Sequence, residues 1–295
     1  MRTSFKELLE QQHTILLDGA MGTMLFASGL EPGGAPEGWN LESPEKVRAV
    51  HRAYITEGSS VILTNTFGGT PLRLQMHGLD GQTEELNRIG AELAGEVAEQ
   101  AENAIVVAGS IGPSGGILEP YGDLPYDELV QAFRRQVDGL VEGGVDILWI
   151  ETMSDLGEVR AAVEGARLVT QDVPLAATMT FDTHGRTMMG VTPEDALEQM
   201  SGLDLAALGA NCGNGTQEIE TVIGKMAALE PEQPLIAKSN AGIPHVDDGV
   251  VVYDGTPEVM AAYARKVQDL GARLIGGCCG TTPAHLAAMH AALNN

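Results

Sequence analysis

The chain has 295 residues, with 41 acidic and 17 basic side chains and a formal net charge of −24. A surface this acidic repels phosphate groups, which excludes nucleic-acid binding and disfavours contact with an anionic membrane. Its three cysteines are too few for a disulfide scaffold and favour a reducing compartment. The N-terminal MRTSFKELLEQQH lacks the apolar stretch of a signal peptide. We therefore expect a cytoplasmic protein with no nucleic-acid or membrane partner.

Short apolar segments recur along the chain with longer segments between them. Most of the apolar segments lack the alternating polar positions of a sheet with one wet face, which predicts strands covered on both faces. The eight predicted strands are Ile15–Ala20, Val61–Thr66, Ile105–Ile111, Ile147–Thr152, Leu175–Phe181, Leu208–Cys212, Leu235–Asn240 and Leu274–Cys278.

A helix is predicted after each strand. Ser43 is a good N-cap for the first helix, and Pro193 and Pro283 each follow a threonine, which is typical of a helix start. Eight βα units without a break in composition predict one (β/α)8 TIM barrel over residues 1–295. The predicted helices are Pro44–Gly58, Thr83–Glu102, Tyr126–Gly143, Asp155–Gln171, Pro193–Gly202, Thr216–Leu229, Thr256–Leu270 and Pro283–Leu293.

The cysteines all fall at the ends of predicted strands, where the active site of such a barrel lies. Cys212 ends the sixth strand, and Cys278 and Cys279 end the eighth. Three thiolates at one rim suit Zn2+, which favours sulfur ligands, and they leave a fourth position open as in a catalytic site. The alternatives are three small buried thiols or a disulfide between Cys278 and Cys279.

An open metal position beside three thiolates favours a particular chemistry. A thiol that enters this position is deprotonated by the metal, as coordinated thiols are. Thiolate ligands also donate charge to zinc, which makes the metal a poor Lewis acid for water. The pattern therefore favours alkyl transfer to a thiol over hydrolysis.

The sequence resembles the homocysteine S-methyltransferase family over residues 16–286. The matching segments include LLDGAMGTML, VILTNTFGGT, GANCGNG, NAGIP and GARLIGGCCGTTPAHL. The resemblance implies that residues 1–295 form a homocysteine-binding barrel with Zn2+ held by Cys212, Cys278 and Cys279. It also implies methyl transfer to homocysteine, giving methionine.

Further site residues follow from the same resemblance. By position, Asp18 and Gly19 belong to the homocysteine pocket, and Glu151, together with the cysteines, belongs to the catalytic set as the carboxylate that receives the homocysteine amino group. The alternative for Glu151 is an exposed rim carboxylate. Asn211 and Asn240 either orient polar groups at the site or structure their own loops.

The methyl donor is the least determined part of the prediction. Stand-alone relatives use onium donors such as glycine betaine, dimethylsulfonio compounds or S-methylmethionine, and aromatic faces bind such cations. Trp39, Phe67 and Tyr121 follow the first three predicted strands. Trp39 resembles the loop tryptophan of betaine–homocysteine methyltransferases, with packing on a helix as its alternative. Gly68 stands where the mammalian betaine enzyme has a tyrosine.

The sequence combines features of short bacterial betaine–homocysteine methyltransferases and of the N-terminal barrel of cobalamin-dependent methionine synthase. We expect zinc-dependent methyl transfer from an onium donor, glycine betaine first, to homocysteine by a monomer or homodimer. One alternative is the homocysteine-binding subunit of a cobalamin- and methyltetrahydrofolate-dependent system. Others are an S-methylmethionine-dependent enzyme and a non-catalytic zinc-binding or redox-sensing barrel.

Overall fold

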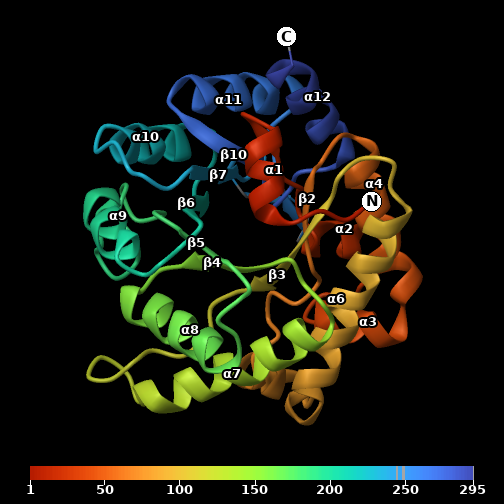
Figure 1. Cartoon of the computed structure of the whole chain (residues 1–295), viewed down its shortest axis with the longest axis vertical. Helices are drawn as coiled ribbons and strands as arrows, with labels where there is room; N and C mark the ends of the chain where they lie inside the picture. The colour runs from red at the N-terminus through yellow and green to blue at the C-terminus, as the bar shows by residue number, and fades with distance from the viewer. Residues whose placement is uncertain (244, 248–249, 295) are drawn as a thin grey trace.

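Eight parallel strands surround a central axis, and helices pack around the outside of the strands (Figure 1). The computed structural model describes residues 1–243, 245–247 and 250–294. The order along the sheet is β1, β10, β7, β6, β5, β4, β3, β2. The strands are β1 (Ile15–Leu16), β2 (Val61–Leu63), β3 (Val106–Ile111), β4 (Ile147–Met153), β5 (Leu175–Met179), β6 (Ala207–Cys212), β7 (Leu235–Ser239) and β10 (Ala272–Gly277).

The two ends of this sheet meet at a narrow seam between β1 and β2. Leu17, just after β1, forms a parallel bridge with Val61. Beyond it, the backbone N–H of Leu63 donates to the Asp18 side chain at 2.7 Å and not to a strand carbonyl. The first two strands are therefore shorter than predicted, because a side chain replaces the ladder at the seam. The (β/α)8 TIM barrel itself is confirmed.

A helix follows each barrel strand at the predicted place. Pro193 and Pro283 begin α9 and α12 as predicted, and Thr192 caps α9 through its side chain. Thr256 caps α11 in the same way. Ser43 occupies the N-cap position of α4 without a side-chain capping bond, so the expected cap is wrong there. The helices are α4 (Pro44–Thr56), α6 (Thr83–Gln100), α7 (Tyr126–Glu142), α8 (Leu156–Val169), α9 (Pro193–Ser201), α10 (Thr216–Ala227), α11 (Pro257–Asp269) and α12 (Pro283–Leu293).

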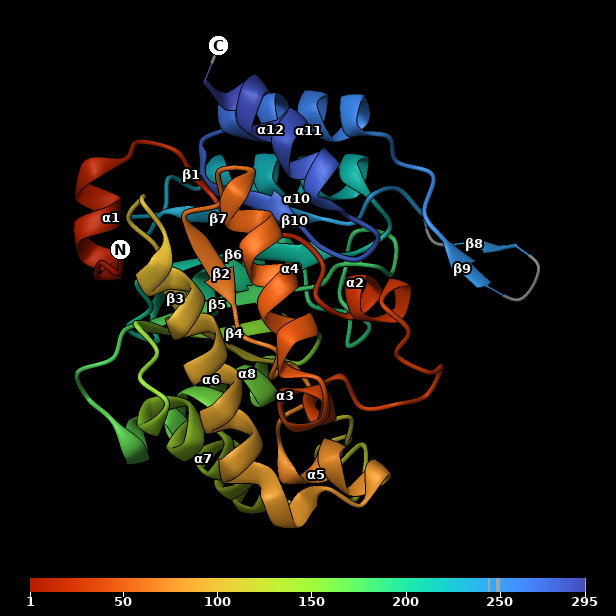
Figure 2. The same cartoon turned by 90° about the vertical axis from the view of Figure 1, so that its right-hand side faces the viewer.

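The remaining elements lie before the barrel or in its loops. Helix α1 lies at one end of the barrel, and α2 and the antiparallel β8–β9 hairpin lie at the other end (Figure 2). These elements are α1 (Phe5–Gln11), α2 (Gly22–Ala27), η1 (Pro36–Gly38), α3 (Trp39–Glu42), α5 (Pro71–Leu74), η2 (Gln75–His77), η3 (Asp80–Gln82), β8 (His245–Asp247) and β9 (Val250–Val252).

The interior of the barrel is apolar at the end closed by α1. Phe5 of α1 meets Trp149 of β4 edge to face, with ring centroids 6.5 Å apart. Inward-facing side chains of the eight strands pack on this pair: Ile15, Leu17, Val61, Leu63, Val106, Ala108, Ile147, Ala176, Ala207, Ile236 and Leu274. Because side chains alternate along a strand, polar side chains occupy the inward positions nearer the carboxyl ends of five strands: Ser110, Glu151, Thr178, Asn211 and Lys238. A polar layer thus covers the apolar interior.

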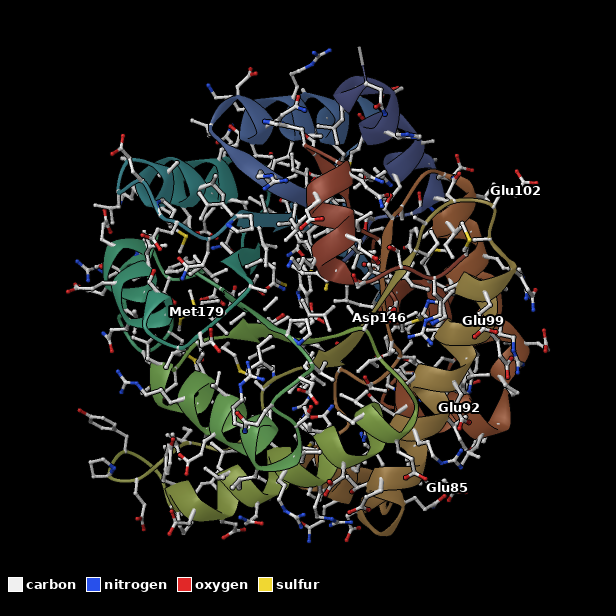
Figure 3. All side chains as sticks on the ribbon, viewed as in Figure 1. Glu85, Glu92, Glu99, Glu102, Asp146 and Met179 are labelled. Atoms are coloured by element: carbon white, nitrogen blue, oxygen red, sulfur yellow. The ribbon has the colours of Figure 1, made fainter. Side chains whose placement is uncertain are left out.

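Many acidic residues lie on the outer helices. Glu85, Glu92 and Glu99 follow one another along the outer side of α6 (Figure 3). In the described part of the chain, no helix is both long and apolar enough to cross a membrane.

Candidate active site

The three cysteines meet at the carboxyl end of the barrel. Cys212 ends β6, and Cys278 and Cys279 follow β10, with β7 between these two strands. Their Sγ atoms all lie within 4.8 Å of one another, and none forms a disulfide. Three sulfur donors in one half-buried cluster are the donor set of a thiophilic metal site.

Tight local geometry holds the cysteines in place. Cys212 has a positive φ of 66°, which is uncommon for a residue other than glycine. The N–H of Cys278 donates to the Ser239 carbonyl at 2.7 Å. Gly280 also has a positive φ of 79°, and a Cβ there would come within 2.2 Å of the Tyr253 ring. Only glycine fits this position beside the cysteine pair.

Gly19 has a packing role at the same rim. A Cβ on Gly19 would lie 2.6 Å from the Thr281 hydroxyl and 2.9 Å from the Tyr54 ring. That hydroxyl accepts a hydrogen bond from Ala20 N at 3.0 Å and donates to the Cys278 carbonyl at 2.7 Å. The close approach at Gly19 therefore ties the loop after β1 to the turn that carries Cys278.

Hydrogen bonds among the three thiols shift the pKa values of Cys212 and Cys279 in opposite directions. Hydrogen bonds to Cys278 and Cys279, together with burial, raise the pKa of Cys212. Hydrogen bonds from Cys212 and Cys278 lower the pKa of Cys279 well below the usual range. The thiols therefore share protons through these hydrogen bonds, and binding a metal requires the thiols to lose those protons.

Glu151 is buried and not an exposed rim carboxylate. It lies on β4 in the polar layer, is 7% exposed, and accepts a hydrogen bond from the Ser110 hydroxyl at 2.5 Å. Burial raises the pKa of Glu151 to about 7, and the nearby charge of Lys238 opposes this rise. A buried carboxylate of this kind suits a cationic group of a ligand.

Lys238 is a charged residue of the polar layer that was not predicted from the sequence. This side chain lies on β7, is 2% exposed, and forms an ion pair with Asp18, with Nζ and Oδ1 2.8 Å apart. Asp18 uses its other oxygen for the N–H of Leu63, so both of its oxygens have protein partners. The available signal was a lysine inside the apolar segment LIAKSN, two positions after the inward-facing Ile236.

The two asparagines structure the rim. Asn211 accepts from the Thr152 N–H at 2.8 Å and the Thr178 hydroxyl at 2.7 Å, and its Nδ2 lies 3.8 Å from Cys278 Sγ. Asn240 donates to the Gly213 carbonyl at 2.7 Å, which holds the loop after Cys212. Asn211 thereby links three strand ends to a cysteine.

The three aromatic side chains do not assemble into one cage. Trp39 is 8% exposed, and Lys46 Nζ lies 4.3 Å from its ring centroid, which matches packing against a helix. Phe67 is 38% exposed and Tyr121 is 82% exposed. In the part of the chain that the structure describes, no ring contact joins these three residues.

Comparison with known proteins shows the family. The family model described as homocysteine S-methyltransferase matches residues 15–293. Methionine synthase from Mycobacterium tuberculosis is 31% identical over 300 residues, which cover 96% of this chain and 25% of that protein. The chain thus spans a quarter of the length of that relative.

Solved structures of similar length agree with the family. The homocysteine methyltransferase MmuM from Escherichia coli, in its metallated form, superposes with a TM-score of 0.82 at 29% identity over 97% of this chain and 98% of that one. The oxidized form of MmuM gives a TM-score of 0.83 at the same identity and coverage. The chain therefore belongs to the homocysteine S-methyltransferase family.

Proposed function

We propose that this protein transfers a methyl group from an onium donor to the thiol of homocysteine and so produces methionine. The observation that carries the proposal is the cluster of Cys212, Cys278 and Cys279, whose sulfur atoms lie within 4.8 Å of one another beside the polar layer. The family and the similarity to MmuM support homocysteine as the acceptor.

Zn2+ is the metal we propose for the cluster. Three thiolates match its preference for sulfur, and the metallated form of MmuM supports a metal in this family. When bound, Zn2+ would lower the pKa of an incoming thiol and so favour its thiolate form.

The protein's own residues bind and orient the substrate. We assign Glu151 to the ammonium group of homocysteine, with the Ser110 hydroxyl fixing the carboxylate. Asn211 orients Cys278. The apolar interior beneath this layer excludes water from the lower side of the site. Holding the acceptor sulfur against the donor methyl group supplies the proximity that such a transfer needs.

The donor we propose first is glycine betaine, with a dimethylsulfonio compound or S-methylmethionine as other onium donors. The half-exposed Phe67 ring beside the site loops and the net charge of −24 both favour a cationic donor. The similarity to methionine synthase favours a second candidate, a cobalamin- and methyltetrahydrofolate-dependent reaction in which this barrel binds homocysteine.

We propose that residues 1–295 work as one homocysteine-binding barrel domain, as a monomer or homodimer in the cytoplasm. Three free thiols in one cluster support a reducing compartment. Its partners in this proposal are small molecules, homocysteine and the methyl donor, and the acidic surface makes nucleic acid and membranes poor partners.

A donor panel tests the proposal. Zinc-loaded protein is mixed with homocysteine and, in turn, glycine betaine, dimethylsulfonioacetate, S-methylmethionine or methyltetrahydrofolate, and methionine is measured. We expect turnover with one onium donor without cobalamin, and loss of both zinc and turnover in Cys212→Ala and Cys278→Ala. Leu168→Ala, at an exposed position on the outer helix α8, is the control that keeps both. Full activity in a cysteine variant that has lost zinc contradicts the mechanism.

A further inference from the structure

Lys238 has more hydrogen-bonding capacity than the protein uses. An ammonium group has three N–H donors. One of them binds Asp18 Oδ1 at 2.8 Å, and no other hydrogen bond to Nζ occurs among the residues that the structure describes. The side chain is 2% exposed. Burying N–H donors of a charged group without acceptors is costly. The two remaining N–H groups of Lys238 are therefore satisfied when a ligand or water accepts hydrogen bonds from them.

The position of Lys238 points to the homocysteine site. Lys238 lies in the same polar layer as Glu151, on β7, which stands between β6 and β10, the two strands whose carboxyl ends carry the cysteines. Burial lowers the pKa of Lys238, but the facing Asp18, Glu151 and Cys278 outweigh burial and raise it. The ammonium group therefore stays charged next to both the buried carboxylate and the thiol cluster.

We propose that Lys238 binds the α-carboxylate of homocysteine. This inference rests on the proposed function. The substrate has an ammonium and a carboxylate on one carbon, and Glu151 and Lys238 offer the opposite charges in one layer. With its sulfur at the cysteines, homocysteine is then bound at three points. Asp18 is a positioning residue, because both of its oxygens are engaged in holding Lys238 and the seam.

The test pairs truncation of the protein with truncation of the substrate. Three thiols are compared as methyl acceptors: homocysteine, the aminothiol that lacks the carboxylate, and the thiol acid that lacks the amino group. In the unmodified protein, kcat/KM falls roughly 10- to 100-fold on loss of either group, as for lost charge-assisted hydrogen bonds. In Lys238→Met the KM for homocysteine rises by a similar factor, with little change in kcat.

The decisive result is which preference disappears. Lys238→Met should lose the preference for homocysteine over the aminothiol and keep the preference over the thiol acid. Glu151→Gln is the matched control and should show the reverse. If Lys238→Met keeps its full preference over the aminothiol, the assignment of Lys238 is overturned. If the unmodified protein methylates homocysteine with none of the donors in the panel, the proposed function fails. The three thiols are then compared by calorimetric binding to the same variants.

A separate measurement shows that the variant site is assembled. Co2+ bound by three thiolates gives intense sulfur-to-metal absorption, so unchanged cobalt stoichiometry and spectrum in Lys238→Met indicate an intact cysteine cluster. If this variant does not fold, the double variant Asp18→Asn with Lys238→Met replaces it, because the double variant also removes the buried Asp18 charge that pairs with Lys238. The double variant should lose the same preference, and retention of that preference also overturns the assignment.

Discussion

Removing the ammonium group of Lys238 should destabilise the protein strongly even without metal or substrate. Lys238 and Asp18 have side chains that are each only 3% exposed, and their charged atoms are 2.8 Å apart. In Lys238→Met, Asp18 keeps the hydrogen bond from Leu63 N but loses its counter-charge. The variant therefore leaves a carboxylate buried and unpaired.

The expected loss follows from this burial. Removing one partner of a buried ion pair costs about 3–5 kcal/mol of the free energy of unfolding, because the remaining charge is uncompensated. The double variant Asp18→Asn with Lys238→Met should recover much of that loss. A surface pair offers the contrast: Arg48 lies 2.7 Å from Glu96, whose side chain is 51% exposed. Arg48→Met should cost less than about 1 kcal/mol.

Urea unfolding of the metal-free, reduced protein measures these differences. The midpoints should fall while the slope with denaturant stays constant. The sign of the pH dependence gives a second check. Burial raises the pKa of Asp18 and the charge of Lys238 opposes this rise. Without Lys238 the folded variant should therefore bind a proton at Asp18 more tightly than the unfolded chain, so its stability should fall as pH rises. The loss in Lys238→Met should therefore be smaller at about pH 5 than at about pH 8.

Two results would refute this reasoning. One is a Lys238→Met variant that loses no more stability than Arg48→Met. The other is a double variant that is as unstable as Lys238→Met, because the instability would then come from lost packing and not from an unpaired charge.

Three further predictions concern other parts of the molecule. His51 is buried and unpartnered within the described chain, and burial lowers its pKa from 6.5 to about 4. Only the unfolded chain gains a proton between these values, so stability should fall by about 3 kcal/mol as pH drops through them, and unfolding of His51→Leu should lack this loss. Phe5→Ala should cost about 3–5 kcal/mol in urea unfolding, whereas Phe26→Ala, 44% exposed, should cost far less; equal losses would contradict the role of α1 in closing the barrel. With zinc bound, the KM for homocysteine should fall as pH rises through about 7, the pKa of Glu151, because the carboxylate form of Glu151 binds the ammonium group. A Glu151→Gln variant with the same pH profile of KM would argue against this role of Glu151.

The regular part of the fold was predictable because each strand is a short apolar segment and several helices, such as α9, α11 and α12, begin at a threonine followed by proline. The cysteine cluster was predictable for a related reason, since all three cysteines stand at strand ends. Lys238 was missed because its strand was read from its final residues, Ser239 and Asn240, and not from the alternation that starts at Ile236. Trp39 shows a different difficulty, because a loop sequence does not reveal that Lys46 covers the ring.

The Asp18–Lys238 contact also helps to hold the seam of the barrel between β1 and β2 closed. Between β1 and β2 the backbone provides one bridge, at Leu17 and Val61, and the next link across is the Asp18 side chain on Leu63 N. That side chain is in turn held by Lys238 from β7. The seam of the barrel is thus held by two side chains, Asp18 and Lys238, and Lys238 belongs to the polar layer. Local opening of the seam and rearrangement of the polar layer both disrupt the Asp18–Lys238 contact. A ligand that holds Lys238 in place therefore also raises the free energy of opening the seam.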